Sequence, residues 1–268
     1  MAISIHPTAI VDKEAQLADG VKVGPFCIIG PKVSLGKNVE LVSHVTLYGD
    51  LNIGADCILY SHVSMGHPPQ DFKHKGGPVG IVIGERNVFR EYVTVHPGTD
   101  CGHRNTIIGN DGFFMVGCHI AHECRIGDHA IIANYVQLAG AVTIGNYCNL
   151  GGLAAIHQFT RIGNYAFIAG MATVIYDVIP YGYVKQNPAH LAGLNIVGLK
   201  RRGFDKKTVR DLRAAYRLLF AAEGTFVERQ EDTARLYKGS PEVMEIVDFI
   251  KAQDKRPIAL PSSGGTAP

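Results

Sequence analysis

Apolar residues recur at every sixth position over most of the chain. The series runs unbroken from residue 5 to residue 65, resumes in the same phase at residue 83, and continues from residue 108 to residue 174 after a shift of one position. The position four residues further on is also apolar or small through most of the repeat. A six-residue period does not keep to one face of a 3.6-residue helical turn, so the pattern excludes an amphipathic helix here. It predicts short strands joined by tight corners, with two inward positions in every six residues.

Three of these six-residue repeats, here called hexads, make one triangular coil of 18 residues. Coils stacked on one another form a parallel β-helix, in which each backbone group pairs with the coil above or below. We therefore expect an all-β parallel β-helix over residues 1–186. Polar insertions that break the repeat predict loops at residues 67–78 and 96–106.

Helical signals follow the end of the repeat. Asp205 is placed as an N-cap, Thr225 and Glu228 form a capping-box pattern, and Ser240 with Pro241 opens a third helix. We expect a small α-helical domain at residues 187–256. The tail at residues 257–268 is rich in Ser, Gly and Pro, and we expect it to be disordered.

Composition narrows the class of protein. With 46% hydrophobic and 19% charged residues the chain should be ordered, and no segment approaches the roughly 20 apolar residues of a membrane span. A net charge of +2 argues against bulk nucleic-acid binding. The first residues lack the basic start and apolar block of a secretory signal, so we expect a cytoplasmic protein. Five of the six cysteines fall on an inward position and should be free core thiols: Cys27, Cys57, Cys118, Cys124 and Cys148.

Outward histidines are the first candidates for chemistry. His119 and His122 lie on either side of an inward position, and coil arithmetic places Gly140 and then Gln158 above His122. A histidine beside an unobstructed glycine N–H and an amide side chain suits acyl transfer, because it can take a proton while donors stabilise the oxyanion. No Ser or Cys is placed to form a covalent intermediate, so direct transfer is the simpler prediction. A single outward histidine is nevertheless more often inert than catalytic.

Two further segments could bind substrate. The polar loop at residues 70–73 should lie beside the expected β-helix, although it could be a plain solvated loop. Lys200, Arg201 and Arg202 form a basic triplet shortly after Asn195 and could bind a diphosphate. Such triplets are, however, commonly just solvated. Arg213 and its neighbours at helical spacing form either a solvated face or a docking site for an acidic partner.

Four motifs carry a resemblance to a known family. They are His-Ile-Ala-His-Glu at 119–123, Ala-Ile-His-Gln-Phe at 155–159, Gln-Asp-Phe-Lys at 70–73 and Leu-Asn-Ile-Val-Gly-Leu-Lys-Arg-Arg-Gly-Phe at 194–204. Over about residues 5–240 the chain closely resembles the UDP-N-acetylglucosamine O-acyltransferases that begin lipid A synthesis. The resemblance implies a left-handed β-helix, an exception to the usual crossover rule, assembled as a homotrimer with sites between subunits.

The resemblance also implies a reaction and residue roles. An (R)-3-hydroxyacyl chain would pass from the phosphopantetheine arm of acyl carrier protein to the sugar 3-OH of UDP-N-acetylglucosamine, with no cofactor and no metal. His122 would be the general base and the Gly140 amide the oxyanion donor. Gly170, with Met171 beside it, would measure the acyl chain. Positions implied to contact substrate are Gln70, Asp71, Lys73, His96, His119, His157, Gln158, Asn195, Arg201 and Arg202.

Three positions depart from the family pattern. Glu123 stands where aspartate is usual beside the base, Ala141 where many members carry histidine, and Val197 where many carry glutamate. Because two polar groups are lost around the acceptor and nucleotide, the acceptor could instead be the 3-amino analogue of the sugar.

Other functions remain open at this point. A zinc carbonic anhydrase on the same scaffold needs three converging histidines, and His62 and His67 belong to a coil far below His122. A non-catalytic, nucleotide-binding trimer is compatible with the composition. The related N-acyltransferase of the same pathway carries an amino-terminal uridine-binding domain, whereas the hexads here begin at residue 5.

Overall fold

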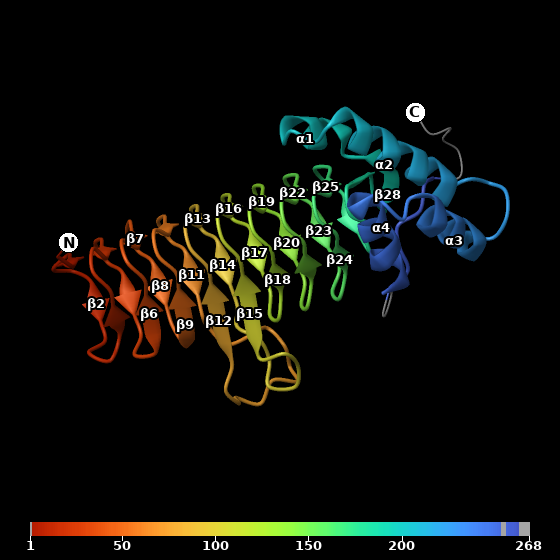
Figure 1. The fold of residues 1–268 in the computed structure, drawn as a ribbon. Helices are drawn as coiled ribbons and strands as arrows, with labels where there is room; N and C mark the ends of the chain where they lie inside the picture. Colours follow the sequence, from red (N-terminus) through yellow and green to blue (C-terminus); the bar gives the residue numbers. More distant parts are fainter. Residues whose placement is uncertain (1, 253–255, 263–268) are drawn as a thin grey trace.

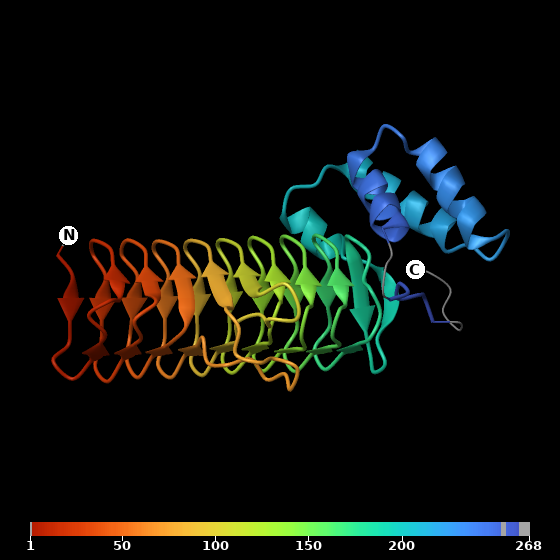
Figure 2. The same cartoon turned by 90° about the horizontal axis from the view of Figure 1, so that it is seen from below.

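The chain winds into a long three-sided prism with a helical domain at its carboxy-terminal end (Figures 1 and 2). The computed structural model describes residues 2–252 and 256–262. Strands one coil apart pair in parallel, with Ser4 opposite Lys22 and Ile10 opposite Ile28. The spacing of 18 residues confirms the triangular coil that the hexads predict.

Each side of the prism is one sheet. The first contains β1 (Ser4–Ile5), β4 (Lys22–Val23), β7 (Glu40–Leu41), β10 (Ile58–Leu59), β13 (Val88–Phe89), β16 (Phe113–Phe114), β19 (Ile131–Ile132), β22 (Asn149–Leu150), β25 (Phe167–Ile168), β27 (Gly182–Lys185) and β28 (His190–Leu194). The second contains β2 (Ile10–Val11), β5 (Ile28–Ile29), β8 (Thr46–Leu47), β11 (Ser64–Met65), β14 (Thr94–Val95), β17 (His119–Ile120), β20 (Gln137–Leu138), β23 (Ala155–Ile156) and β26 (Thr173–Val174). The third contains β3 (Gln16–Leu17), β6 (Val33–Leu35), β9 (Asp50–Ile53), β12 (Gly80–Ile83), β15 (Asn105–Ile108), β18 (Arg125–Ile126), β21 (Thr143–Ile144) and β24 (Arg161–Ile162).

The two inward positions of each hexad form the core. Leu47 and Val45 are fully buried, and the same holds for most of the apolar ladder above them. The first coil is less buried because no coil lies beneath it: Ile5 is 46% exposed, and Val11 and Leu17 are only partly buried. The five inward cysteines are free and buried, and burial raises the pKa of Cys148 to about 12, so it stays a neutral thiol.

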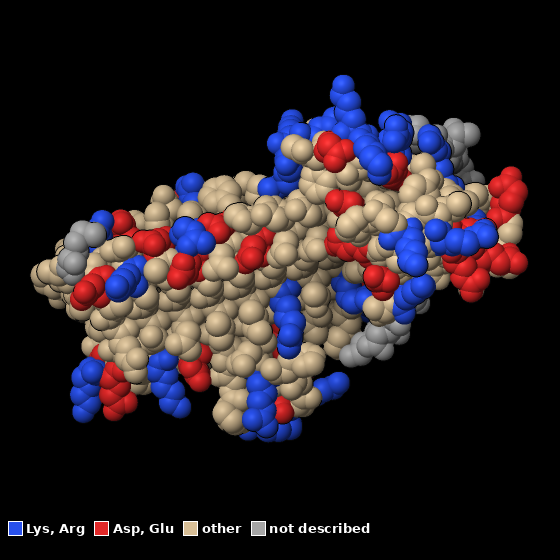
Figure 3. Space-filling model, in the orientation of Figure 1, with Lys and Arg blue, Asp and Glu red and all other residues tan. Residues whose placement is uncertain are grey.

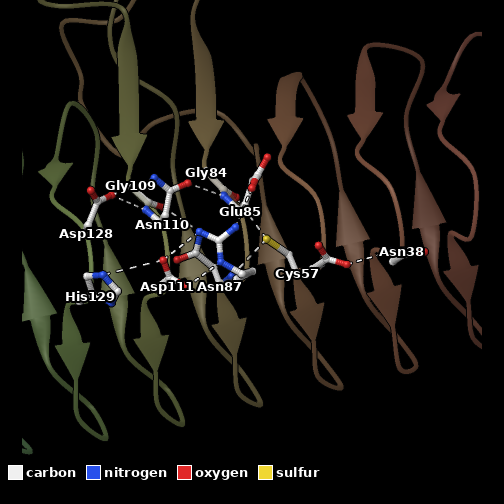
Figure 4. A network of polar contacts seen from close by, with 12 residues as sticks. Asn38, Cys57, Gly84, Glu85, Asn87, Gly109, Asn110, Asp111, Asp128 and His129 are labelled. Atoms are coloured by element: carbon white, nitrogen blue, oxygen red, sulfur yellow. Dashed lines mark hydrogen bonds and ion pairs between the residues drawn. The ribbon is translucent and has the colours of Figure 1, made fainter.

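A polar residue occupies the inward position at Asn87, which the hexad rule does not anticipate. Asn87 is fully buried, yet its Nδ2 donates to the carbonyl of Gly109 at 2.8 Å and its Oδ1 accepts from the amide of Gly112 at 2.8 Å (Figure 4). Its own amide donates to Cys57 Sγ at 3.3 Å. Because all these groups are paired, the amide sits in the ladder without an unmet hydrogen bond.

Two loops leave the prism on the same side, below β12 and β15 in Figure 1. The first lies between Met65 and Gly80, close to the expected 67–78. The second ends earlier than expected, because Asn105 and Thr106 already pair with β12. The one-residue phase shift is therefore absorbed at residues 96–104, and the coils on either side keep their register.

The carboxy-terminal part differs from expectation at both ends. Residues 190–194 form β28, which pairs antiparallel with β27, so the sheet extends beyond residue 186. The helices begin only at α1 (Ile196–Arg201) and continue with α2 (Lys206–Leu219), α3 (Phe226–Leu236) and α4 (Pro241–Lys251). Asp205 caps α2 and Thr225 forms the capping box of α3 with Glu228, as predicted.

The expected disordered tail is ordered over the residues that the structure describes. Ile258 and Ala259 are buried, and the Ala259 amide donates to the carbonyl of Asp177 at 2.7 Å. The prediction of disorder from Ser, Gly and Pro content is therefore wrong for the described residues, because this segment forms backbone hydrogen bonds with the last coil. Residues 263–268 lie outside the described residues. No helix within residues 2–252 and 256–262 is long and apolar enough to span a membrane.

Candidate active site

His122 lies at the corner where the chain leaves β17 of the second sheet for β18 of the third. Two pockets border its side chain. One, of 360 Å³, is lined by residues that include Gln70, His96, His119, Gln137 and Gly140. The other, of 630 Å³, is lined by residues that include Asp71, Lys73, Glu123, Ala141 and Gln158. The structure thus brings together most of the candidate residues of the β-helix.

Glu123 orients the His122 imidazole. Its Oε2 lies 3.1 Å from His122 Nδ1. Its Oε1 accepts from Thr99 Oγ1 at 2.7 Å and from the His103 amide at 2.8 Å. A carboxylate accepts hydrogen bonds and cannot donate them, so Nδ1 carries the proton and Nε2 is left with a free lone pair. The longer side chain of glutamate therefore reaches both the base and the 96–104 loop.

Backbone and loop geometry make room for this glutamate. Glu123 has φ +64, an uncommon angle for a residue with a side chain, and its amide donates to Thr106 Oγ1 at 2.9 Å. A Cβ on Gly102 would come 1.6 Å from Glu123 Oε1, so any other residue there would displace the carboxylate from its present position. Burial raises the pKa of Glu123, but the bonds from Thr99 and His122 outweigh it and lower that pKa below its usual value, which keeps the carboxylate charged.

Gly140 lies directly against the imidazole. A Cβ on this residue would lie 2.3 Å from Cε1 and 2.5 Å from Nε2 of His122, so glycine is required for the ring to occupy its position. The neighbouring amides of Ala139 and Ala141 donate to the carbonyls of Ile156 and His122. Among the described residues the Gly140 amide has no such acceptor. It is therefore a donor beside the atom that would take the proton.

The other two histidines of the smaller pocket are held neutral. His119 Nδ1 lies 2.8 Å from Thr94 Oγ1, and burial lowers the pKa of His119 to about 4. His96 Nδ1 lies 2.9 Å from the carbonyl of Pro68, and burial lowers its pKa too. Neutral imidazoles can bind hydroxyl and amide groups of a polar substrate without adding charge.

His157 and Gln158 were both expected to line the site, but the structure places only Gln158 at a pocket beside His122. Gln158 lines the larger pocket. His157 lines neither pocket beside His122, and Arg256 Nη2 lies 2.6 Å from its Nδ1. Arg256 also donates to the carbonyl of Gln158 at 2.8 Å. The carboxy-terminal segment thus fixes the backbone next to the site.

Asn195, Arg201 and Arg202 lie elsewhere on the chain, around a third pocket of 700 Å³ that borders the first sheet. Asn195 Oδ1 caps α1 by accepting from the Gly198 amide at 3.1 Å, and its Nδ2 donates to the Tyr165 carbonyl at 2.9 Å. The Arg202 guanidinium lies 4.4 Å from the centre of the Tyr147 ring. A single chain therefore does not bring these three residues to His122.

Gly170 and Met171 are exposed at a corner of the prism, Met171 to 72%. A Cβ on Gly170 would meet only backbone atoms of Gly152 within 4 Å, the nearest being the carbonyl oxygen in a tight contact at 3.2 Å. Val197, 62% exposed, borders the third pocket. Ala141 and Val197 thus leave apolar surface in two pockets.

Neither histidine considered for zinc lines a pocket beside His122, although His67 lies near enough to His96 to help lower the pKa of His96. The rings of His62 and Tyr92 stack at 4.9 Å, while His67 packs against Tyr48. Among the described residues, no three His, Cys, Asp or Glu side chains are arranged to hold a metal ion.

Sequence reasoning missed Thr99, His103 and Arg256. Thr99 and His103 belong to the loop that interrupts the hexads, so no stacking rule relates them to residue 123. Glu123 itself was a usable signal. Its side chain is one methylene longer than the aspartate usual at this position, so its carboxylate reaches partners further from the backbone. Arg256 precedes a segment whose composition suggested disorder.

A prism of hexapeptide coils, with a histidine–carboxylate pair beside a glycine amide that has no acceptor among the described residues, defines a hexapeptide-repeat acyltransferase. Residues 177–259 match the family profile described as Udp N-acetylglucosamine O-acyltransferase, Domain 2. A relative from Caulobacter vibrioides, named as an acyl-carrier-protein-dependent UDP-N-acetylglucosamine O-acyltransferase, is 55% identical over 97% of this chain and 98% of its own. A relative of the same name from Thermodesulfovibrio yellowstonii is 42% identical over 94% and 97%.

Solved structures of proteins with the same name have the same fold as this chain. UDP-N-acetylglucosamine O-acyltransferase from Moraxella catarrhalis superimposes with a TM-score of 0.92 at 38% identity, covering 95% of this chain and 99% of that one. The Francisella novicida enzyme gives 0.93 at 36% identity, covering 97% and 95%. The chain belongs to the UDP-N-acetylglucosamine O-acyltransferase family. The fold is accordingly the left-handed parallel β-helix that the resemblance implied.

Proposed function

We propose that this protein transfers an (R)-3-hydroxyacyl chain from acyl carrier protein to the 3-OH of UDP-N-acetylglucosamine, the first step of lipid A synthesis, with His122 as general base. Family membership supports the overall reaction. The observation that carries the mechanism is the arrangement of Glu123 Oε2, 3.1 Å from His122 Nδ1, with Gly140 packed against the Nε2 edge of the same ring.

The acyl group passes directly from the thioester to the sugar, through a tetrahedral intermediate and without becoming attached to the protein. His122 Nε2 takes the proton of the sugar hydroxyl as its oxygen bonds to the thioester carbonyl carbon. The Gly140 amide donates to the oxyanion, and the charge of Glu123 stabilises the imidazolium that forms. When the carbon–sulfur bond breaks, His122 returns the proton to the leaving thiolate. The acyl group arrives already activated as a thioester, so this scheme requires no cofactor or metal.

The remaining substrate contacts divide between the loop and a second subunit. Asp71 and Lys73 line the larger pocket beside His122 and would hold the sugar, with His119 on the other side of the base. Asn195 and Arg201 border a different sheet. We propose a homotrimer in which these residues reach the nucleotide diphosphate of a sugar bound at the neighbour's His122. Gly170 would bound the acyl groove.

Mixing two inactive variants tests the shared cleft. If each site takes His122 from one subunit and Arg201 from the next, randomly mixed trimers of His122→Ala and Arg201→Ala contain intact pairs at about one quarter of their sites. Activity should therefore return on co-expression. No recovery, with trimers shown by sedimentation, would place both residues in one subunit's site or in none.

The helical domain is the proposed docking site for acyl carrier protein. Figure 3 shows lysine and arginine side chains gathered over α1 and α2. Arg210, Arg213 and Arg217 are exposed on α2, and such a basic surface attracts an acidic partner. Arg213→Glu should raise the KM for the acyl carrier protein substrate and leave the KM for the sugar nucleotide unchanged. The six free cysteines favour a reducing, cytoplasmic location for this reaction.

A second acceptor deserves a direct comparison. Ala141 contributes no polar group to the larger pocket, and Val197 none to the pocket that holds Arg201. A 3-amino sugar is a stronger nucleophile and needs less assistance, so the protein could prefer it. A mass-spectrometric assay with equal amounts of the 3-OH and 3-amino nucleotides and several acyl chain lengths decides between ester and amide products. No product with either acceptor, while the parent still binds UDP sugar, would favour the non-catalytic trimer.

A further inference from the structure

Asp100 joins the two loops that leave the prism beside the site. Its carboxylate accepts from the Lys75 amide at 3.0 Å and from the Gly77 amide at 2.9 Å. His74 Nδ1 lies 3.2 Å from Asp100 Oδ1. Both side chains of this contact are largely buried, with 13% and 19% of their surfaces exposed. One side chain of the 96–104 loop thus contacts three residues of the 67–78 loop, His74, Lys75 and Gly77.

The contact is close enough to require glycine on the opposite loop. A Cβ on Gly77 would lie 2.7 Å from Asp100 Cβ and 2.9 Å from its Oδ2. Any larger residue would push the two loops apart. The joint can therefore be disturbed from either side by a single small substitution.

The two loops carry different parts of the site. The 67–78 loop carries Asp71 and Lys73 into the larger pocket. The 96–104 loop holds Glu123 through Thr99 Oγ1, at 2.7 Å, one residue before Asp100. A single short loop therefore contacts both the sugar-binding segment and the carboxylate that orients the base.

We propose that Asp100 is a positioning residue that fixes the 67–78 loop in the conformation that presents Asp71 and Lys73 to the sugar. The inference rests on the proposed function for the identity of the substrate, while the loop contact itself does not. Asp100 touches no reacting atom. Its loss frees the sugar-binding loop but leaves the bond between Thr99 and Glu123, so binding of the nucleotide suffers more than the chemical step.

Three variants and one control test this assignment. Asp100→Ala removes all three bonds, Asp100→Asn keeps one acceptor oxygen, and Gly77→Ala separates the loops from the other side. Asp12→Ala is the control, because Asp12 likewise accepts from a backbone amide, that of Glu14 at 2.9 Å, but in a coil at the far end of the prism. Each protein is assayed for kcat and for the KM of both substrates, and hydrogen exchange is followed in peptides covering residues 70–78.

Asp100→Ala and Gly77→Ala should raise the KM for the sugar nucleotide about tenfold or more, with kcat and the KM for the carrier substrate within about threefold of the parent. Asp100→Asn should fall between, and Asp12→Ala should match the parent. Exchange at residues 70–78 should rise in the first two variants. Unchanged exchange and KM in Asp100→Ala would overturn the proposal, and so would an equal fall in kcat and rise in both KM values. A parent without turnover would refute the proposed function, and exchange alone would then decide whether Asp100 fixes the loop.

Discussion

Replacing Glu123 with glutamine should abolish most activity without disturbing the fold. In the parent, Glu123 Oε1 accepts from Thr99 and from the His103 amide, while Oε2 faces His122 Nδ1. Glutamine can satisfy the two loop donors with its one carbonyl oxygen. Its NH₂ group then faces Nδ1 and donates to it, which moves the imidazole proton to Nε2. The ring would be the wrong tautomer to accept a proton from the sugar hydroxyl.

The size of the loss follows from these contacts. Returning the ring to the active tautomer costs a charge-assisted hydrogen bond, about 1.5–3 kcal/mol, and leaves two donors facing each other in a buried place, about 1–3 kcal/mol more. A total of about 2.5–6 kcal/mol lowers kcat by about 10²–10⁴-fold, since about 1.36 kcal/mol is a factor of ten in rate. Steady-state assays with saturating substrates measure kcat directly.

Two companion variants sharpen the comparison. Glu40→Gln changes an exposed glutamate that pairs with Lys22 on the first sheet, and it should leave kcat unchanged. Glu123→Asp keeps the charge but is one methylene short of the loop donors, so it should retain more activity than glutamine. A Glu123→Gln protein with kcat within about threefold of the parent would refute the argument that the carboxylate sets the tautomer of His122.

The remaining predictions concern stability and product length. Asn87→Asp should destabilise the prism by about 3 kcal/mol or more in urea unfolding, because a buried carboxylate oxygen would face the Gly109 carbonyl; equal stability would contradict the reading of this amide. Burial lowers the pKa of His119 from 6.5 to about 4, so the unfolded chain binds the extra proton between those values and stability should fall as pH drops through that window, by about 3 kcal/mol before solvent screening reduces it. His119→Gln should flatten the curve of Tm against pH there, and a curve identical to the parent's would count against this origin. Gly170→Leu should fold with a small local shift, because the new Cβ meets only backbone atoms of Gly152, the nearest being its oxygen at 3.2 Å. It should shift the products toward shorter acyl chains by mass spectrometry, and an unchanged chain profile would remove Gly170 as the boundary of the groove.

Periodic and local features of this protein can be read from sequence. Burial of Leu47 and Val45 follows from their places in the hexad, because each coil repeats the same two inward directions. The stacking of Gly140 on His122 follows from the same spacing. The caps at Asp205 and Thr225 depend on neighbouring residues alone. All of these contacts join residues whose relation is set by strand pairing or by one helical turn.

Contacts made by the loops and the carboxy-terminal segment required the tertiary structure. Asp100 meets Gly77, and Thr99 meets Glu123, across segments that break the repeat, so no fixed spacing relates them. Arg256 reaches the Gln158 carbonyl from 98 residues further along the chain, a contact that neither composition nor the hexad spacing reveals. The amino-acid sequence by itself determined the prism and the position of the base on it. Only the folded chain decided which loop orients the base, because long-range contacts depend on how far the inserted segments project and where they return.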